Sequence, residues 1–285
     1  MCKIRKFLRA CGMVFSDDYY LRPSPDEIRW IQNLLGGLEA SDLGIVDGEI
    51  ENGNGDHRQG IKYIHLYDCN EFSMGVFCLP TGATIPLHDH PGMTVLSRVL
   101  YGSLSVNAYD WIKPPDSNHP NFGLVSSTFN DKICDSTSPA SVLYPRSGGN
   151  IHSVTALTPC GFLDVLTPPY SDAKGRPSTY YSEIPIPFLP GFVILEREVG
   201  VPKNLSVTSA PYNGPELFLH SAISMAETRE ENVYLPKLTE KAAERCEEMV
   251  KFMEKVAYKN VEERSIILCS TKYKNVTRAV AMAGQ

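Results

Sequence analysis

Two histidines one residue apart, His88 and His90, are the first sign of chemistry in the chain. Alternate residues of a strand point to the same face, so both imidazoles can reach one metal ion. A third histidine, His152, lies in a strand-like run roughly sixty residues later, and a barrel can bring that run opposite the first. Imidazole ligands suit zinc, copper, iron or nickel, and three protein ligands leave coordination positions open. The spacing therefore predicts a catalytic metal centre.

Asp164 is a second candidate for chemistry, because it interrupts the apolar run Phe162–Leu166. The period of a strand places its side chain on one face with Phe162 and Leu166. A carboxylate inside such a strand is costly unless it has a partner. Two interpretations stay open: a hydrogen-bond anchor of the fold, or a group that supports the metal centre or a substrate amine.

Short runs rich in Val, Ile, Tyr and Thr, separated by Gly, Pro, Asn and Ser, must position these residues. Many short strands with such punctuation predict a sandwich or a barrel. A helix is expected to begin at Ser24, which can cap it, with Pro25 in its first position. The predicted strands are Ile61–Leu66, Ser73–Leu79, Thr94–Tyr101, Leu104–Tyr109, Ser141–Tyr144, Ile151–Leu157 and Gly161–Leu166.

Shifts in composition divide the chain into four parts. We expect a leader at residues 1–22, a barrel domain at 23–200, a Pro-rich linker at 201–224 and a helical segment at 225–285. The last boundary lies where irregular, Pro-rich sequence gives way to charged sequence.

Charge and cysteine content restrict the partners and the compartment. The chain has 285 residues and a net charge of −6, which argues against the basic surface that nucleic-acid binding needs. No apolar run is long enough to span a membrane or to act as a signal peptide. The eight cysteines include no Cys-x-x-Cys pair. Reduced thiols and a cytoplasmic or nuclear location are therefore expected.

The histidine segments resemble the two motifs of the cupin superfamily. The first motif matches from Gly82 through His90 to Gly102. The glutamate usual a few residues after the histidine pair is missing, because Met93–Val95 stand there. Thiol dioxygenases of this superfamily likewise use three histidines and no carboxylate. The resemblance implies a mainly β fold, a cupin barrel (a double-stranded β-helix or jelly roll). Together with the helix expected at Ser24 and the helical segment expected at 225–285, the expected fold is this barrel with an N-terminal helix and a short helical C-terminal appendage.

Residues from about 24 to 187 resemble, more closely, the plant cysteine oxidases, relatives of cysteamine dioxygenase. The segments that carry this resemblance are Pro86–Ser97, Leu100–Leu104, Ala108–Trp111 and Leu163–Tyr170. It implies one Fe(2+) per chain, held by the three histidines, and O2 as co-substrate. It also implies oxidation of the N-terminal cysteine of target proteins, hypoxia-responsive transcription factors, to cysteine sulfinic acid. Such an enzyme is an oxygen sensor in an N-degron pathway, and we expect a monomer.

The resemblance also implies roles for single residues. Asp164 matches an aspartate that is functionally important in the family, Tyr170 a tyrosine at the mouth of the active site, and Tyr180 a tyrosine near the metal. Some relatives carry a cysteine two residues before that last tyrosine, which can form a thioether crosslink. Ser178 stands there in this chain, so this crosslink cannot form.

The C-terminal part resembles the start of 14-3-3 proteins. The matching segments are Met225–Leu235, Cys246–Val256, Val261–Arg264 and Tyr273–Val276. Pro236 falls inside an expected helix, where proline costs about 3 kcal/mol. Lys274 matches a phosphate-binding lysine, but the arginines needed beside it are absent. We therefore expect a gene-fusion remnant and not a working phosphopeptide reader.

Other functions stay open. A small-thiol dioxygenase or a cupin isomerase would also use the metal centre, and free cysteine would need a cation for its carboxylate, for which Arg98 and Arg146 are candidates. A non-catalytic cupin scaffold could instead use the 14-3-3-like hairpin for interaction, although the three intact histidines argue against it. A further hypothesis is that Cys2, in a flexible leader, is itself oxidised by another copy of the enzyme.

Overall fold

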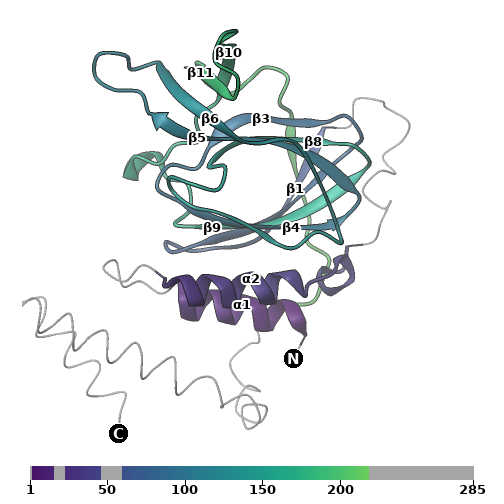
Figure 1. Ribbon diagram of the computed structural model, residues 1–285. Coiled ribbons are helices and arrows are strands. Elements are labelled where there is room, and N and C mark those ends of the chain that lie inside the picture. The colour runs from purple at the N-terminus through teal and green to yellow at the C-terminus, as the bar shows by residue number, and fades with distance from the viewer. Residues whose placement is uncertain (1, 16–22, 46–59, 218–285) are drawn as a thin grey trace, which may run out of the picture. The chain divides into compact units, whose positions relative to one another are not determined.

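The computed structural model describes residues 2–15, 23–45 and 60–217 (Figure 1). No helix in these ranges is long and apolar enough to cross a membrane. The helices, in chain order, are α1 (Lys3–Val14), α2 (Pro25–Gly36) and the short 3₁₀ helices η1 (Ala40–Leu43) and η2 (Asp172–Lys174). The strands are β1 (Ile61–Asp68), β2 (Ser73–Leu79), β3 (Thr84–Asp89), β4 (Thr94–Tyr101), β5 (Ser103–Lys113), β6 (Phe122–Asp135), β7 (Ser141–Leu143), β8 (Ile151–Ala156), β9 (Cys160–Thr167), β10 (Tyr181–Pro185), β11 (Phe192–Arg197) and β12 (Val207–Ala210).

Two six-stranded sheets face each other and curl around an interior (Figure 1). The first has the strand order β12-β1-β2-β9-β4-β7, and the second has the order β10-β11-β6-β5-β8-β3. Each strand expected from apolar alternation forms, to within a few residues at its ends. The predicted mainly β cupin barrel is therefore confirmed.

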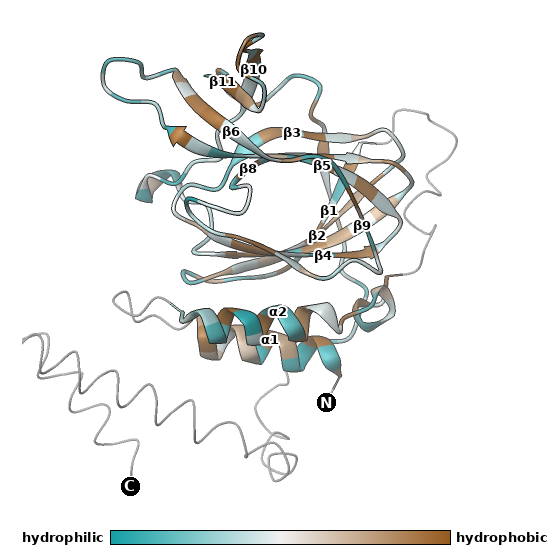
Figure 2. Ribbon diagram, viewed as in Figure 1, coloured by the Kyte–Doolittle hydropathy of each residue, from teal (hydrophilic) through white to brown (hydrophobic). Residues whose placement is uncertain are grey.

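Helices α1 and α2 cover the outer face of the first sheet (Figure 1). One hydrophobic cluster joins Phe7 of α1 and Ile31 of α2 to Leu163 and Val165 of β9. Apolar residues colour parts of both helix ribbons brown in Figure 2, and the buried ones belong to this cluster. Strand β9 is thus buried on both faces, which explains its nearly continuous apolar sequence. Because side chains alternate, Asp164 between these two residues points into the barrel.

The predicted start of α2 is confirmed. The Ser24 hydroxyl accepts from the Glu27 backbone N–H, and the Glu27 carboxylate accepts from the Ser24 N–H at 2.7 Å, a capping box that satisfies both ends of the turn. The expected leader differs from the structure, since α1 buries Ile4 and Cys11 completely. Cys2 caps α1 and packs against the same cluster. It therefore lies half-buried at the start of a helix and not in a free arm.

The Pro-rich stretch is more regular than the sequence predicts. Strand β12 forms within the expected linker at 201–224 and pairs in parallel with β1. The chain beyond β12 also packs closely, since a Cβ on Gly44 would lie 2.6 Å from the Gly214 Cα. Pro202 and Pro211 lie outside the strands, where a missing N–H is tolerated. The part of the expected linker up to residue 217 is therefore integrated into the barrel, and the expected segment at 225–285 lies outside the described residues.

Gly102→Ala is expected to destabilise the barrel strongly. Gly102 joins β4 to β5 at φ +69°, and an added Cβ would overlap the Pro159 carbonyl oxygen and lie 2.7 Å from the Cys160 Cα. The left-handed conformation costs a non-glycine residue about 1–2 kcal/mol, and overlap with backbone atoms adds to that cost. Gly82→Ala is the matched control, because Gly82 has φ +79° but open space around it. Urea unfolding should show a loss of stability at least about twofold larger for Gly102→Ala, and equal losses would contradict this account.

Candidate metal centre

The structure brings the three predicted histidines together inside the barrel. His88 lies in β3 and His90 directly follows it, while His152 lies in β8. His88 and His152 are direct cross-strand partners in the second sheet. One ring nitrogen from each of the three lies within 4.8 Å of the others. This separation is short enough for all three to bind a single ion.

Hydrogen bonds at the back of the imidazoles fix which nitrogen carries the proton. The His88 Nδ1 lies 2.8 Å from the Pro86 carbonyl oxygen, and the His152 Nδ1 lies 3.2 Å from the Gly149 carbonyl oxygen. A carbonyl oxygen can only accept, so both Nδ1 atoms donate and both Nε2 lone pairs are free. The His90 Nε2 is buried and has no hydrogen-bond partner among the described residues.

Tyr170 fixes the third imidazole in the same way. Its hydroxyl oxygen lies 2.7 Å from the Asp89 carbonyl oxygen and 2.8 Å from the His90 Nδ1. The hydroxyl must donate to the carbonyl, so it accepts from the His90 Nδ1–H. The resemblance places Tyr170 at the mouth of the site. Its hydroxyl group therefore holds the orientation of the His90 imidazole by this hydrogen bond.

Tyr170→Phe is expected to weaken metal binding by about 10–100-fold, the usual cost of losing the hydrogen-bond partner of a ligand histidine. The fold should survive, because phenylalanine keeps the ring. Competition with a chelator would measure the loss, and Tyr144→Phe, at an exposed position, is the control. Equal metal affinity in Tyr170→Phe and wild type would show that this hydrogen bond does not support the site.

Burial keeps the three imidazoles neutral. It lowers the pKa of His88, and it lowers the pKa of His152 to about 3. Burial, followed by the nearby His88 and His152, also lowers the pKa of His90. Neutral imidazole is the form that binds a metal, and a buried nitrogen without a partner is costly. These residues fit a divalent transition metal such as iron, zinc or copper.

Asn150 and Asp110 hold the backbone around the ligands. The Asn150 side chain accepts from the His90 N–H at 3.2 Å and donates to the His90 carbonyl oxygen at 2.9 Å. Asp110 accepts from the backbone N–H groups of Gly149 and Asn150 at 3.0 and 3.1 Å. The sequence interpretation did not single out either residue. The one available signal was that Asp110 lies in the Ala108–Trp111 segment of the family resemblance.

Asp89, between the two histidines of the pair, fixes the segment that follows η2. Its carboxylate accepts from the Thr179 N–H at 3.1 Å and from the Tyr181 hydroxyl at 3.0 Å. Burial raises the pKa of this carboxyl group, against the opposing effect of those hydrogen bonds. Tyr180 is thereby held beside His88, with ring centroids 6.2 Å apart. Asp89 is a third positioning residue that the sequence interpretation missed, after Asn150 and Asp110.

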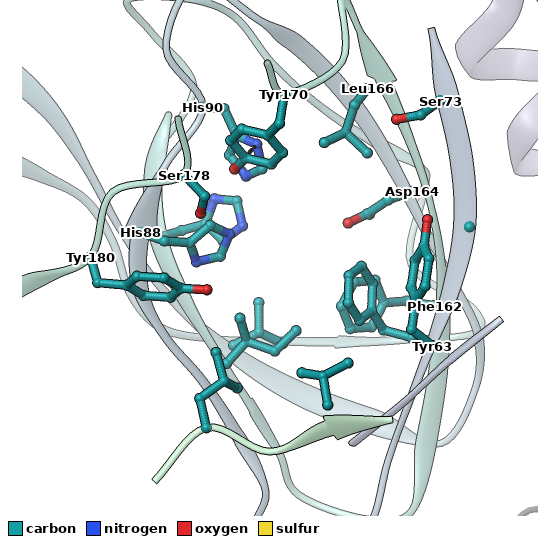
Figure 3. A pocket seen from close by; sticks show the side chains of 17 residues that line it. Tyr63, Ser73, His88, His90, Phe162, Asp164, Leu166, Tyr170, Ser178 and Tyr180 are labelled. Carbon is teal, nitrogen blue, oxygen red and sulfur yellow. Dashed lines mark hydrogen bonds between the residues drawn. The ribbon is translucent and has the colours of Figure 1, made fainter. Parts of the chain in front are cut away.

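A cavity of about 380 Å³ opens in front of the histidines. Asp164 lies on the opposite wall and points toward them, and Tyr170 and Tyr180 lie on the histidine side (Figure 3). The three histidines, Asp164, Tyr170 and Tyr180 therefore line one cavity. The Asp164 Oδ1 has no hydrogen-bond partner among the described residues, and burial raises the pKa of this carboxyl group to about 7. The remaining lining residues are Tyr63, Ser73, Gly75, Phe77, Ile85, Val154, Phe162, Leu166, Ser178, Leu205 and Val207.

Neither arginine proposed for a substrate carboxylate lies in this cavity. Arg98 donates to the Ser138 carbonyl oxygen and, at 2.8 Å, to the Ser136 carbonyl oxygen. Arg146 is also absent from the lining, and no lysine or arginine of the described ranges lines the cavity. Asp164 is the only carboxylate among the described residues that line the cavity.

Comparison with known proteins gives two separate matches. A 14-3-3-like protein from Solanum tuberosum is 59% identical over 58 residues, which cover 19% of this chain and 22% of that protein. The match agrees with the 14-3-3 resemblance of the C-terminal part and is limited to a short segment. The second match covers the barrel domain.

Plant cysteine oxidase 2 from Arabidopsis thaliana is 35% identical over 237 residues, covering 76% of this chain and 84% of that protein. The 2-aminoethanethiol dioxygenase from Mus musculus is 31% identical over 175 residues, covering 55% of this chain and 68% of that protein. The family model PCO_ADO matches residues 34–217, which include the three histidines and the facing aspartate. The chain therefore belongs to the PCO_ADO family.

Proposed function

We propose that this chain is a non-haem iron(II) thiol dioxygenase that oxidises N-terminal cysteine of proteins to cysteine sulfinic acid. The observation that carries the proposal is the cavity, which sets three neutral imidazoles opposite one buried carboxylate with an unpartnered oxygen. Membership of the PCO_ADO family supports it. Relatives named cysteine oxidase and 2-aminoethanethiol dioxygenase act on molecules that carry both a thiol and an amine.

We propose one iron ion per chain, held by the Nε2 atoms of His88, His90 and His152. When bound there, iron(II) supplies the redox chemistry by which both atoms of O2 join a thiolate sulfur. The hydrogen bonds to Pro86 and Gly149 keep their imidazoles oriented toward the cavity. The three imidazoles bring no negative charge, so the site favours an anionic sulfur as the next ligand.

Asp164 is proposed to bind the substrate amine. Its carboxylate lies across the cavity from the histidines (Figure 3), and an ammonium ion would supply the partner that its Oδ1 lacks. Because no lysine or arginine of the described ranges lines the cavity, no side chain there would offset the charge of a free carboxylate on the substrate. An N-terminal cysteine, whose carboxyl group is an amide, and cysteamine both meet this requirement. Free cysteine does not, which argues against the small-amino-acid alternative.

Tyr180 and Ser178 are proposed to contact the substrate from the histidine side. Tyr180 projects its hydroxyl group into the cavity beside His88, and Ser178 lies next to it (Figure 3). Both hydroxyl groups can donate a hydrogen bond to an oxygen atom that is added to sulfur. Asp89 acts only indirectly, since it holds the backbone of this segment.

The test is aerobic incubation of iron-loaded protein with four thiols: a Cys-initiated peptide amide, cysteamine, free cysteine and an N-acetylated Cys peptide. Mass spectrometry should show addition of two oxygen atoms to the first two, with much slower oxidation of free cysteine and of the acetylated peptide. Oxidation of the acetylated peptide as fast as the free peptide would refute amine recognition. A protein that binds iron and oxidises no thiol would favour the non-catalytic scaffold.

We also propose that the enzyme acts as an oxygen sensor, and this role rests on the family resemblance. Oxidation of an N-terminal cysteine creates an acidic terminus that a degradation pathway can distinguish from the thiol. We propose hypoxia-responsive transcription factors as the targets. Target proteins with a Cys-to-Ala change at the N-terminus should persist equally at high and low oxygen, whereas the unchanged targets should accumulate only at low oxygen.

A further inference from the structure

A second cavity, of about 440 Å³, adjoins the histidine cavity and has no role in the chemistry described above. Ser178 and Tyr180 line both cavities. The described residues that line it are Asn121, Ser178, Thr179, Tyr180, Arg197, Glu198, Val199, Gly200 and Val201. Ser178 and Tyr180 therefore lie on the boundary that the metal centre shares with a second cavity at the end of β11.

The wall between the cavities is held in place on both sides. The Asp89 N–H donates to the Thr179 carbonyl oxygen at 3.1 Å, which ties residues 178–180 to β3. The Glu198 N–H donates to the Tyr180 carbonyl oxygen at 2.8 Å, which ties the same segment to the far wall. Thr179 is buried. The second cavity is thus a preformed feature between two fixed backbone segments.

The far wall presents groups that lack partners. Val199 and Val201 have exposed fractions of 102% and 65%, unusually large for valine beside a cavity. The backbone N–H groups of Val199, Gly200 and Val201 make no backbone hydrogen bond within the described ranges. Exposed apolar side chains next to open backbone donors are the features by which an extended peptide is recognised. Arg197 and Glu198 carry opposite charges, so the wall favours neither an acidic nor a basic peptide.

We propose that this cavity, the downstream subsite (residues 178–180 and 197–201), binds the residues that follow the N-terminal cysteine of the substrate. The inference rests on the proposed function. The cysteine enters the histidine cavity, and the extended chain behind it passes Tyr180 and lies along residues 199–201. Its backbone carbonyl groups accept from the open N–H groups, and uncharged, apolar side chains contact Val199 and Val201.

The experiment compares cysteamine, cysteine amide and an uncharged Cys-initiated pentapeptide amide as substrates of the iron-loaded full chain. For wild type, kcat/KM should be about tenfold higher for the pentapeptide than for cysteine amide, which corresponds to about 1.4 kcal/mol of added binding. In a Val199→Asp, Val201→Asp double variant this gain should disappear, while oxidation of cysteamine stays within about twofold of wild type. The matched control is Ile133→Asp on β6, at 65% exposure and outside both cavities, which should keep the full gain.

Failure of the downstream subsite and failure of the proposed function give different results in this experiment. Equal kcat/KM for cysteine amide and pentapeptide in wild type overturns the downstream subsite while leaving thiol oxidation intact. A gain that survives in the double variant, or that is lost equally in Ile133→Asp, also overturns it. If wild type oxidises none of the three thiols, it is the proposed function that fails.

Discussion

His152→Ala is expected to remove most bound iron and to lower sulfinate formation at least about 100-fold. Loss of the partner of a ligand histidine alone weakens a metal site by 10–100-fold, and loss of the ligand itself should exceed that. Only three ligand atoms of the described residues converge on the site, so no neighbour can replace the missing imidazole. Iron content per chain and turnover per chain, measured on the same sample, test this expectation.

His119→Ala is the matched control for that experiment. His119 has an exposed side chain, and its Nδ1 lies 3.6 Å from the Asp116 carboxylate on the surface. Its loss should leave both iron content and turnover within about twofold of wild type. A His152→Ala protein with one iron per chain and normal turnover would refute the assignment of the three ligands.

Asp164→Asn is expected to lower kcat/KM for a Cys-initiated peptide by about 10–100-fold at pH 8, because a charge-assisted hydrogen bond to the substrate ammonium is worth about 1.5–3 kcal/mol. Iron content should not change. Burial raises the pKa of Asp164 to about 7, so the wild-type advantage should grow as the pH rises through 7. Dividing the wild-type kcat/KM by that of Asp164→Asn at each pH cancels the effect of the substrate's own titration.

The same substitution should stabilise the substrate-free protein at high pH. The pKa of Asp164 is higher in the folded chain than the ordinary value of 3.8, so ionisation disfavours folding. That cost begins above the unfolded pKa, increases as the pH approaches 7 and is constant beyond it. Asparagine removes the ionisation, so the gain in Tm should be larger at pH 8 than at pH 5. A lower Tm with unchanged turnover per iron would show instead that Asp164 is an anchor of the fold.

Local sequence patterns account for much of the barrel and for the centre of the site. Alternating or continuous apolar runs predict β1, β2, β4 and β9, because burial of side chains determines both the pattern and the strand. Strand β6 was missed, since a large part of it carries polar residues such as Ser126 and Asn130. Strands β11 and β12 were missed for a different reason, because flanking prolines dominate the local composition.

The residues that position the metal ligands could not be found from local patterns. Asp89, Asp110 and Asn150 act by hydrogen bonds to backbone groups that the fold brings close. Asn150, for example, contacts His90 across sixty residues of sequence. A single polar residue in a loop or strand carries no periodic signal of such contacts. The ligands themselves were found because their residue type is rare and their spacing is specific.

The burial of β9 on both faces has a consequence for how this sequence can vary. Leu163 and Val165 lie in the cluster shared with the helices, and Asp164 and Leu166 line the cavity. An insertion or deletion of one residue would exchange these two sets, placing the carboxylate in the helix contact and an aliphatic side chain opposite the histidines. Substitutions can alter either face of β9 separately, but a change of length by one residue would damage the scaffold and the substrate pocket together. Gaps in an alignment of functional relatives should therefore avoid residues 160–167.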